Sequence, residues 1–269
     1  MGQLRGDGHD IIELTGDTSA DSTHKLRTAI SSGDVERLLV AGGDGLVHLA
    51  IQELAETGIP LLISPTGSGN DFATALGIDS KSVRALLSDA PCRVDLLRIS
   101  TGSMTRWVAS IVIAGFPATI NERANSLALP IGRHVYTVAA ALELPTYRRT
   151  HLELRVDDET LSLDSGMLAI GNTSLFGGGM LACPSADPTD GLAEVTSIEG
   201  VGRVAILGHL QKRAGGSADR PEVLRTTGKH ITLETSGVSL WGDGENVAIS
   251  PAVIETVPGA LAVHCLICE

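Results

Sequence analysis

Apolar runs alternate with helical patterns over the first third of the chain. The apolar runs lie at Ile11–Leu14, Leu38–Ala41 and Ile59–Ile63. Helices are predicted over Ser22–Ile30, Leu46–Thr57 and Lys81–Ser88, the last of them capped by Ser80. Short buried strands separated by helices are typical of a parallel sheet that is covered on both faces. The pattern therefore predicts a parallel α/β domain over residues 1–92.

The helix predicted over Leu46–Thr57 has one apolar face. The residues expected on that face recur at helical spacing and are Leu46, Leu49, Ala50 and Leu54. We expect this face to pack on the sheet.

The pattern changes from about Arg93 onward. Short segments of alternating polarity appear, such as HLELRVDDETLSLDSGMLAIGN and HITLETSGVSLWGDGENVAIS, and helices are predicted near Val135–Leu144 and Val201–Arg213. Alternation of this kind is typical of antiparallel hairpins. The expected fold class is α/β plus β: the parallel domain is followed by an antiparallel β-sandwich over residues 93–269, whose C-terminal end can return to the first domain.

Composition bounds the class of protein. The chain has 269 residues, 43% of them hydrophobic, which is enough for a sizeable core. The longest mostly apolar stretch, Trp107–Ile120, has 14 residues and is interrupted by Gly115 and Pro117, whereas a membrane-spanning helix needs about 20. The N-terminus MGQLRGDGHD lacks the apolar core of a signal peptide. A cytoplasmic protein without a transmembrane segment is expected.

The cysteines and the net charge narrow the chemistry further. Cys265 and Cys268 stand at the chain end without a second ligand pair, which favours buried thiols on a terminal strand over a metal or redox site. The formal net charge of −12 argues against broad nucleic-acid binding. Because the chain is acidic overall, any contact with a membrane would have to use local patches of the surface or exposed apolar side chains at loop tips. Arg148 and Arg149 could contact anionic lipid headgroups, but simple solvation is the favoured interpretation, since exposed arginines commonly have no such role.

Two glycine turns, each followed by a predicted helix, stand out in residues 38–78. The turns are Gly42-Gly43-Asp44-Gly45 and Gly67-Ser68-Gly69-Asn70-Asp71. Backbone N–H groups and the positive end of a helix dipole meet at such turns, and glycine lets a phosphate approach closely. Neither turn matches a Walker A loop or G-x-G-x-x-G, so the glycines could also serve only to make tight turns.

Four segments together resemble the diacylglycerol kinase catalytic family, which includes sphingosine, ceramide and bacterial lipid kinases. The segments are GGDG, PTGSGNDFA, FGGGMLACPSADPTDGLAEV and WGDGENV, in that order along the chain. The resemblance implies a Rossmann-like nucleotide-binding α/β domain followed by a β-sandwich domain for the lipid. It also implies ATP and Mg²⁺ as cofactors and a lipid substrate reached by peripheral contact with a membrane surface.

The same resemblance gives the motif residues candidate roles. Gly42, Gly43 and Gly45, together with Gly67, Ser68 and Gly69, would surround the ATP phosphates, while Asn70 and Asp71 brace the second loop. Asp44 would orient its loop or reach the magnesium of the nucleotide through water. Asp243 and Glu245 would form the acidic centre that accepts the proton of the lipid hydroxyl. On a strand, these two carboxylates would face the same side, although Asp-Gly also often marks a solvated hairpin tip.

A structural magnesium is implied at a second acidic pair. Asp187, Asp190 and the carbonyl of Leu192 would contact the ion, and oxygen ligands of this kind suit a hard cation. The alternative is an aspartate-capped turn without metal.

The chain departs from the family pattern at several positions. Leu46, Val47 and His48 follow GGDG in place of Thr-x-Asn, and Thr74 stands where arginine is common. No N-P-x-x-G segment precedes Ile11, so the α/β domain is expected to lack its first strand. An open parallel edge would then invite association, with a homodimer as one outcome.

The favoured function is an ATP-dependent lipid kinase that phosphorylates a lipid hydroxyl, with diacylglycerol as the preferred substrate and phosphatidic acid as the product. A sphingoid base and phosphatidylglycerol also carry a suitable hydroxyl. A kinase of NAD is the nearest enzymatic alternative because it shares GGDG, but the N-D-F-A and D-G-E segments weigh against it. A catalytically silent protein that binds nucleotide or lipid is the alternative from a different class.

Overall fold

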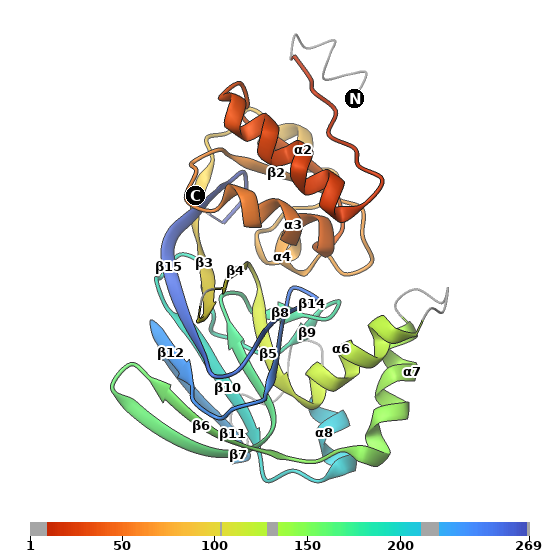
Figure 1. Cartoon of the computed structure of the whole chain (residues 1–269), viewed down its shortest axis with the longest axis vertical. Coiled ribbons are helices and arrows are strands. Elements are labelled where there is room, and N and C mark those ends of the chain that lie inside the picture. The colour runs from red at the N-terminus through yellow and green to blue at the C-terminus, as the bar shows by residue number, and fades with distance from the viewer. Residues whose placement is uncertain (1–9, 103, 128–133, 211–220, 268–269) are drawn as a thin grey trace. The chain divides into compact units, whose positions relative to one another are not determined.

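The computed structural model describes residues 10–102, 104–127, 134–210 and 221–267 (Figure 1). The chain divides into two compact units, residues 1–36 and residues 37–269. The domain boundary expected at 92/93 falls inside the second unit, where strand β3 begins, and it stays a prediction.

The first unit contains one helix, α2 (Ser19–Ser32), among its described residues. The Thr18 side chain caps the helix by accepting a hydrogen bond from the backbone N–H of Asp21 at 3.1 Å. Gly33 ends it in the left-handed region at φ 79°. The strand predicted at Ile11–Leu14 is wrong: the segment has no regular structure, and Ile12 is 62% exposed. Without a buried face or a ladder, apolar side chains alone do not make a strand.

The parallel α/β part opens the second unit. Its elements are β1 (Leu38–Gly42), α3 (Asp44–Leu54), β2 (Leu61–Pro65), α4 (Asp71–Ala75) and α5 (Val83–Leu86). β1 pairs in parallel with β2 from Leu38↔Leu61 to Gly42↔Pro65. The C-terminal strand β15 (Ala252–Val263) joins β2 in parallel at Val263↔Leu61. The end of the chain therefore returns to this sheet, and among the described strands β1 is an edge.

Helix α3 packs with a face shifted by one position from the expected one. The buried residues are Val47, His48, Ala50, Ile51 and Leu54, whereas Leu46 is 42% exposed. The helix begins at Asp44, two residues earlier than predicted, and its buried apolar residues at i, i+3, i+4 and i+7 are Val47, Ala50, Ile51 and Leu54.

The helix predicted over Lys81–Ser88 is a single turn, α5, and Ser80 does not cap it. Instead, the Asp79 carboxylate accepts hydrogen bonds from the backbone N–H groups of Lys81 and Ser82 at 2.9 and 2.7 Å. Asp79 forms this turn because its short side chain reaches the backbone two and three residues ahead.

Antiparallel strands dominate the remainder of the second unit. They are β3 (Cys92–Thr101), β4 (Met104–Val108), β5 (Ile111–Gly115), β6 (Thr150–Val156), β7 (Glu159–Gly171), β8 (Leu175–Phe176), β9 (Met180–Leu181), β10 (Ala193–Glu199), β11 (Val223–Gly228), β12 (His230–Leu233), β13 (Ser239–Gly242) and β14 (Glu245–Ile249). The main hydrogen-bonded path runs β1-β2-β15-β12-β6-β7-β5-β13-β14. The predicted fold class, a parallel α/β part followed by an antiparallel β-sandwich part, is confirmed.

Four helical segments accompany the antiparallel part (Figure 1). They are α6 (Phe116–Ser126), α7 (His134–Glu143), the 3₁₀ turn η1 (Leu144–Thr146) and α8 (Arg203–Leu210). A buried cluster that includes Ile113, Phe116, Met167 and Trp241 joins these helices to the strands. The helix predicted near Val135–Leu144 is confirmed, whereas the predicted end of α8 near Arg213 lies outside the described residues.

No described helix is both long and apolar enough to cross a membrane. Cys265 is buried, but it follows the last strand rather than lying on it, since β15 ends at Val263. Cys268 lies outside the described residues.

Asn172 joins three segments in the interior. Its side chain is fully buried, and Nδ2 donates to the carbonyls of Asp95 at 2.8 Å and Ala109 at 2.9 Å. Its backbone N–H donates to the Ser110 carbonyl at 2.8 Å. Because Ala109 and Ser110 connect β4 to β5, Asn172 fixes the position of this connection.

We expect Asn172→Ala to lower the free energy of unfolding by about 2 to 4 kcal/mol, since two buried carbonyls lose their donor and a cavity forms. Urea unfolding at neutral pH measures the effect. Asn246→Ala is the matched control, because this amide is exposed and donates to Ser239 Oγ at 2.7 Å. Equal losses in both variants would contradict a special role for Asn172.

Candidate functional site

A cavity of about 990 Å³ collects all four sequence motifs within the second unit. The motif residues that line it are Gly43, Asp44, Gly45, Gly67, Ser68, Gly69, Asp71, Phe176, Gly177, Gly178, Met180, Trp241, Asp243, Gly244 and Glu245. Gly42 and Asn70 are not in its wall, nor are Asp187, Asp190 and Leu192. The structure therefore brings the two glycine loops and the Asp-Gly-Glu turn together and leaves the second acidic pair elsewhere.

Asp44 connects the first glycine loop to the second. Its Oδ2 accepts the backbone N–H of Asn70 at 2.7 Å, and its Oδ1 accepts the N–H of Asp71 at 3.0 Å. These N–H groups stand at the start of α4, where no preceding helical carbonyl is available to them. The carboxylate of Asp44 thus occupies the anion-binding end of α4, the place that the glycine pattern had assigned to a phosphate.

Gly43 and Gly67 lie where the two loops touch, and neither position has room for a side chain. A Cβ added at Gly67 would lie 2.5 Å from the Cα of Gly43, and one added at Gly43 would lie 3.0 Å from the Cα of Gly67. Gly45 differs, because a Cβ there would meet nothing within 4 Å. Of these three positions, only Gly45 has free space in front of it for a ligand.

The second loop is closed on itself and tied to the third motif. Asn70 Oδ1 accepts the N–H of Gly67 at 3.0 Å, and Asn70 Nδ2 donates to the Gly67 carbonyl at 2.8 Å. Asp71 accepts the N–H groups of Gly178 and Gly179, both at 2.8 Å. Gly178 and Gly179 have φ values of 85° and 98°, a left-handed conformation that glycine adopts easily. Asn70 therefore closes the second loop through hydrogen bonds to Gly67, and Asp71 ties the loop to the glycine turn at 178–179.

Asp243 occupies a hairpin turn, not a strand. Asp243 and Gly244 link β13 to β14 with φ values of 51° and 88°. Two positive φ values in a two-residue loop are typical of a type I′ turn, in which Asp-Gly is favoured. The expectation that Asp243 and Glu245 face one side of a strand is thus wrong, as is the alternative of a solvated tip, because the Asp243 side chain is only 5% exposed.

Three donors surround the Asp243 carboxylate. The N–H of Ala109 donates to Oδ2 at 2.8 Å and the N–H of Ser110 donates to Oδ1 at 2.9 Å. His48 Nδ1 lies 3.2 Å from Oδ2. Sequence reasoning noted His48 only as a departure from the family pattern. The sequence contained one indication that His48 lies near the site: it follows Asp44 by four residues, which is one helical turn along α3.

Glu245 has a different environment from Asp243. It is exposed at the start of β14 and lines the cavity. The neighbouring Gly244 carbonyl is 3.4 Å from the side-chain amide of Asn125 on α6. Glu245 is therefore the carboxylate of the pair that a substrate can approach.

Negative charge accumulates in the cavity. Burial raises the pKa of Asp44 and Asp71, and repulsion from Asp243 raises both further, against the lowering effect of their backbone donors. Because the native pKa of each exceeds its unfolded value, its contribution to stability is greatest at low pH and decreases as the pH rises through the native pKa. None of the described residues that line the cavity is a lysine or an arginine.

Much of the remaining cavity wall is apolar. Its apolar members, which come mainly from β5, α6 and α7, are Ile111, Ile113, Pro117, Ile120, Ala140, Ala141, Leu144 and Met180, and the same two helices add the polar Asn121, Asn125 and Thr137. Tyr136 on α7 also lines it. Sequence reasoning missed this wall, since its members are dispersed over about 70 positions and each resembles an ordinary core residue.

The second acidic pair lies in a turn near Asp95. Asp187 Oδ1 accepts the N–H and hydroxyl of Thr189 at 2.9 and 2.6 Å, and Asp190 Oδ1 accepts the N–H of Leu192 at 2.8 Å. Burial raises the pKa of Asp95, and the charges of Asp190 and Asp187 raise it further, so the three carboxyls share one region.

These residues fit a hydrated magnesium ion in kind, because carboxylates and a carbonyl are hard oxygen donors and magnesium retains several waters. No group of three or more His, Cys, Asp or Glu residues with metal-binding spacing occurs in the described part of the chain. The metal role of Asp187, Asp190 and Leu192 stays a prediction.

The glycine geometry predicts opposite effects of two similar substitutions. Gly67→Ala should lower the free energy of unfolding by about 1 to 3 kcal/mol, because its methyl group would push the two loop backbones apart. Gly45→Ala should leave stability unchanged or raise it by up to about 1 kcal/mol, since it adds a helix-favouring residue in open space. Urea unfolding of the ligand-free protein distinguishes them, and an equal loss in both variants would contradict the loop-packing role.

Comparisons with known proteins agree with this geometry. The family model described as diacylglycerol kinase catalytic domain matches residues 4–104. The model described as YegS C-terminal NAD kinase beta sandwich-like domain matches residues 110–265. A diacylglycerol kinase structure from Bacillus anthracis str. Sterne superimposes with a TM-score of 0.71 at 18% identity, over 94% of this chain and 84% of that one, which supports the fold.

Relatives of closer sequence extend the match over the chain. The diacylglycerol kinase of Mycobacterium tuberculosis (strain ATCC 25618 / H37Rv) is 34% identical over 98% of this chain and 87% of its own length. A probable lipid kinase YegS-like from Stenotrophomonas maltophilia (strain K279a) is 31% identical over 98% of this chain and 89% of its own length. The resemblance found in the four motifs is confirmed, and the chain belongs to the diacylglycerol kinase and YegS-like lipid kinase family.

Proposed function

We propose that this lipid kinase transfers the γ-phosphate of ATP to the free hydroxyl of diacylglycerol, giving phosphatidic acid. The observation that carries the proposal is the composition of one cavity. The two glycine loops, the carboxylates of Asp44, Asp71, Asp243 and Glu245, and apolar side chains from β5, α6 and α7 all line this one cavity. A lipid whose acyl chains pack against the apolar side chains would present its hydroxyl to the carboxylates, facing the phosphates.

Positioning of the phosphates falls to the first loop and Ser68. Gly45 leaves open space at the start of α3, where N–H groups and the helix dipole favour an anion. Ser68 is exposed in the cavity wall and can donate its hydroxyl. Because the described lining lacks basic residues, we expect ATP to bind as its magnesium complex, in which the metal neutralises phosphate charge.

Proton acceptance is assigned to Glu245. Asp243 accepts two backbone N–H groups and contacts His48, which uses three of the four lone pairs of its carboxylate, so we assign it the role of positioning the turn. In the proposed step, the lipid hydroxyl oxygen forms a bond to the γ-phosphorus while the bond to the bridging oxygen of ADP breaks. The hydroxyl proton passes to Glu245, and the electron pair of the broken bond leaves with ADP.

The apolar wall favours a lipid over NAD as the phosphate acceptor. Side chains such as Ile113, Ile120 and Leu144 can pack against acyl chains, whereas the hydrogen bonds that a ribose or a nicotinamide needs would have to come from the fewer polar side chains beside them, such as Asn121, Asn125 and Thr137. A silent binding protein is the second candidate, because His48 replaces the asparagine expected after GGDG and contacts the acidic centre directly. ATP binding measured separately from phosphate transfer distinguishes an enzyme from such a protein.

Replacing the two carboxylates should separate catalysis from stability. We expect Glu245→Gln to lower kcat by about 10²- to 10⁴-fold with little change in melting temperature, since an exposed base is lost. Asp243→Asn should lower both, because an amide nitrogen would replace an oxygen that accepts a backbone N–H. Transfer of labelled phosphate from ATP to diacylglycerol in mixed micelles measures the rate.

The same assay offers a sphingoid base, phosphatidylglycerol and NAD in parallel. Glu159→Gln, at an exposed turn of the β6–β7 hairpin, is the control and should keep the full rate. Undiminished turnover in Glu245→Gln would remove this residue from the mechanism. Preferred phosphorylation of NAD would instead overturn the lipid assignment.

The second acidic pair is tested by metal dependence. We expect Mg²⁺ to raise the melting temperature of the unaltered chain and to have little effect on the double variant Asp187→Asn/Asp190→Asn, which loses both carboxylate ligands. Asp158→Asn/Glu159→Gln, at the exposed β6–β7 turn, also removes two charges and is the control. If the double variant responds to Mg²⁺ as the unaltered chain does, the pair serves only as a capped turn.

A further inference from the structure

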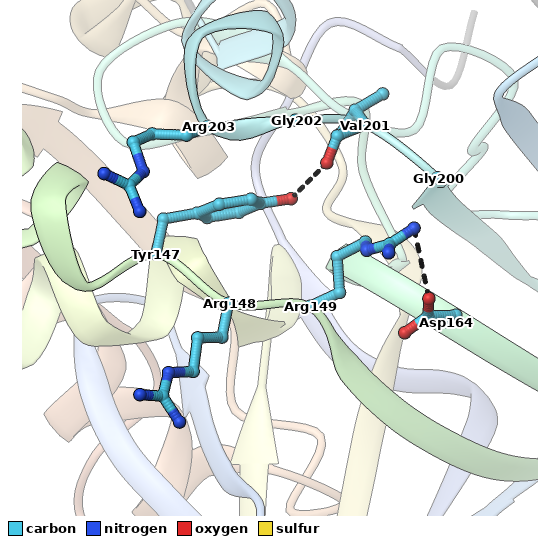
Figure 2. A pocket seen from close by; sticks show the side chains of 8 residues that line it. All are labelled: Tyr147, Arg148, Arg149, Asp164, Gly200, Val201, Gly202 and Arg203. Carbon is cyan, nitrogen blue, oxygen red and sulfur yellow. Dashed lines mark hydrogen bonds and ion pairs between the residues drawn. The ribbon is translucent and has the colours of Figure 1, made fainter.

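A second, shallower pocket of about 480 Å³ lies apart from the cavity described above (Figure 2). It is lined by Tyr147, Arg148, Arg149, Asp164, Gly200, Val201, Gly202 and Arg203. Three arginines and one carboxylate therefore share a small surface of a chain whose formal net charge is −12. This local excess of positive charge is opposite in sign to the chain as a whole.

Tyr147 holds the two sides of the pocket together. Its hydroxyl donates to the Val201 carbonyl at 3.0 Å, as Figure 2 shows, and its ring packs edge-on against Phe116 with centroids 5.2 Å apart. Burial raises the pKa of Tyr147, so the phenol keeps the proton that it donates. The backbone of Arg148 and Arg149 is thereby fixed opposite the segment that ends at Arg203.

Two of the arginines are available to a ligand. Arg149 Nη1 pairs with Asp164 Oδ2 at 3.2 Å, in a contact where both side chains are about half exposed. Within the described parts of the chain, neither Arg148 nor Arg203 has a carboxylate partner. Figure 2 shows both side chains extending away from Asp164. Two exposed guanidinium groups can therefore accept an anionic group without first breaking an ion pair.

Exposed apolar side chains flank these arginines along the chain. Val204, next to Arg203 in the first turn of α8, is 78% exposed, and Leu142 in the last turn of α7 is 53% exposed. The 3₁₀ turn η1 follows α7 directly and contacts α8. Basic groups beside protruding apolar side chains are typical of surfaces that enter the headgroup layer of an anionic membrane.

We propose that this pocket binds the phosphate headgroups of anionic lipids, while Leu142 and Val204 enter the headgroup layer. The proposal rests on the proposed function, because α7 also lines the cavity through Tyr136 and Ala140. Docking here would bring the helix that borders the substrate to the membrane that supplies it. The openness of the pocket and its apolar flanks favour a surface lipid over a free phosphate ion.

Sedimentation of the full chain with lipid vesicles tests the proposal. Phosphatidylcholine vesicles with added phosphatidylglycerol should bind the unaltered chain, and pure phosphatidylcholine vesicles should bind it much less. Arg148→Gln/Arg203→Gln should weaken the anionic interaction by about 25-fold, which is about fivefold per arginine. Arg106→Gln/Arg155→Gln changes the net charge equally at exposed arginines on β4 and β6 and should keep the affinity.

Two further measurements separate the effect of charge from the insertion of apolar side chains, and binding of a lipid headgroup from binding of free phosphate. Val204→Ser should also weaken binding to anionic vesicles, although it leaves the charge unchanged. Equal losses in the two double-arginine variants would overturn the proposal, since total charge would then explain them. A melting temperature raised by inorganic phosphate, together with vesicle binding that Arg148→Gln/Arg203→Gln does not change, would assign the pocket to a free phosphate and also overturn it.

Failure of the docking proposal can be distinguished from failure of the proposed kinase function. Sedimentation requires no turnover, so a specific loss in Arg148→Gln/Arg203→Gln supports docking even if the unaltered chain phosphorylates no lipid. Conversely, turnover of detergent-solubilised diacylglycerol with identical vesicle binding in all variants would leave the kinase assignment standing and overturn the docking site.

Discussion

Carboxylates that each accept two backbone N–H groups hold the loops of this protein in place. Asp44 joins the first glycine loop to the second, Asp71 joins the second to the glycine turn at 178–179, and Asp243 joins its hairpin to the β4–β5 connection. Asp95 makes the same type of contact with the N–H groups of Gly191 and Gly259, at 2.7 and 2.8 Å. Hydrogen bonds to an ionised acceptor are stronger than neutral ones, so a few aspartates can order segments that have little regular structure.

This construction has an electrostatic consequence for the kinase site. Asp44, Asp71 and Asp243 repel one another, and burial adds to the free energy of keeping the first two ionised. A magnesium nucleotide would relieve that repulsion while supplying the phosphates. The same interactions also distinguish Asp243 from Glu245, because the first carboxylate is hydrogen-bonded to the backbone and the second is exposed in the cavity wall.

Helix α7 connects the two surfaces that we propose to contact lipids. Its cavity side contributes Tyr136 and Ala140 to the apolar wall, and its last turn exposes Leu142 before the chain reaches the arginine pocket. A strongly acidic chain would be repelled by anionic membranes in most orientations. A localised positive patch beside the substrate helix would therefore favour one orientation of approach, in addition to raising affinity.

The sequence by itself determined the family and several of the local elements, whereas a strand at Ile11–Leu14 and a full helix at Lys81–Ser88 did not form. β1, α3, β2 and the β6–β7 hairpin follow from periodicities that act over a few residues, and the glycine and aspartate motifs identified the loops. Tertiary structure decided the function of each motif residue, because the partners of Asp44, Asp71 and Asp243 lie 27, 107 and 134 positions away. It likewise placed His48 at the acidic centre and assembled the apolar wall from dispersed side chains. Contacts at such separations depend on how the strands pair, and no local pattern encodes that pairing.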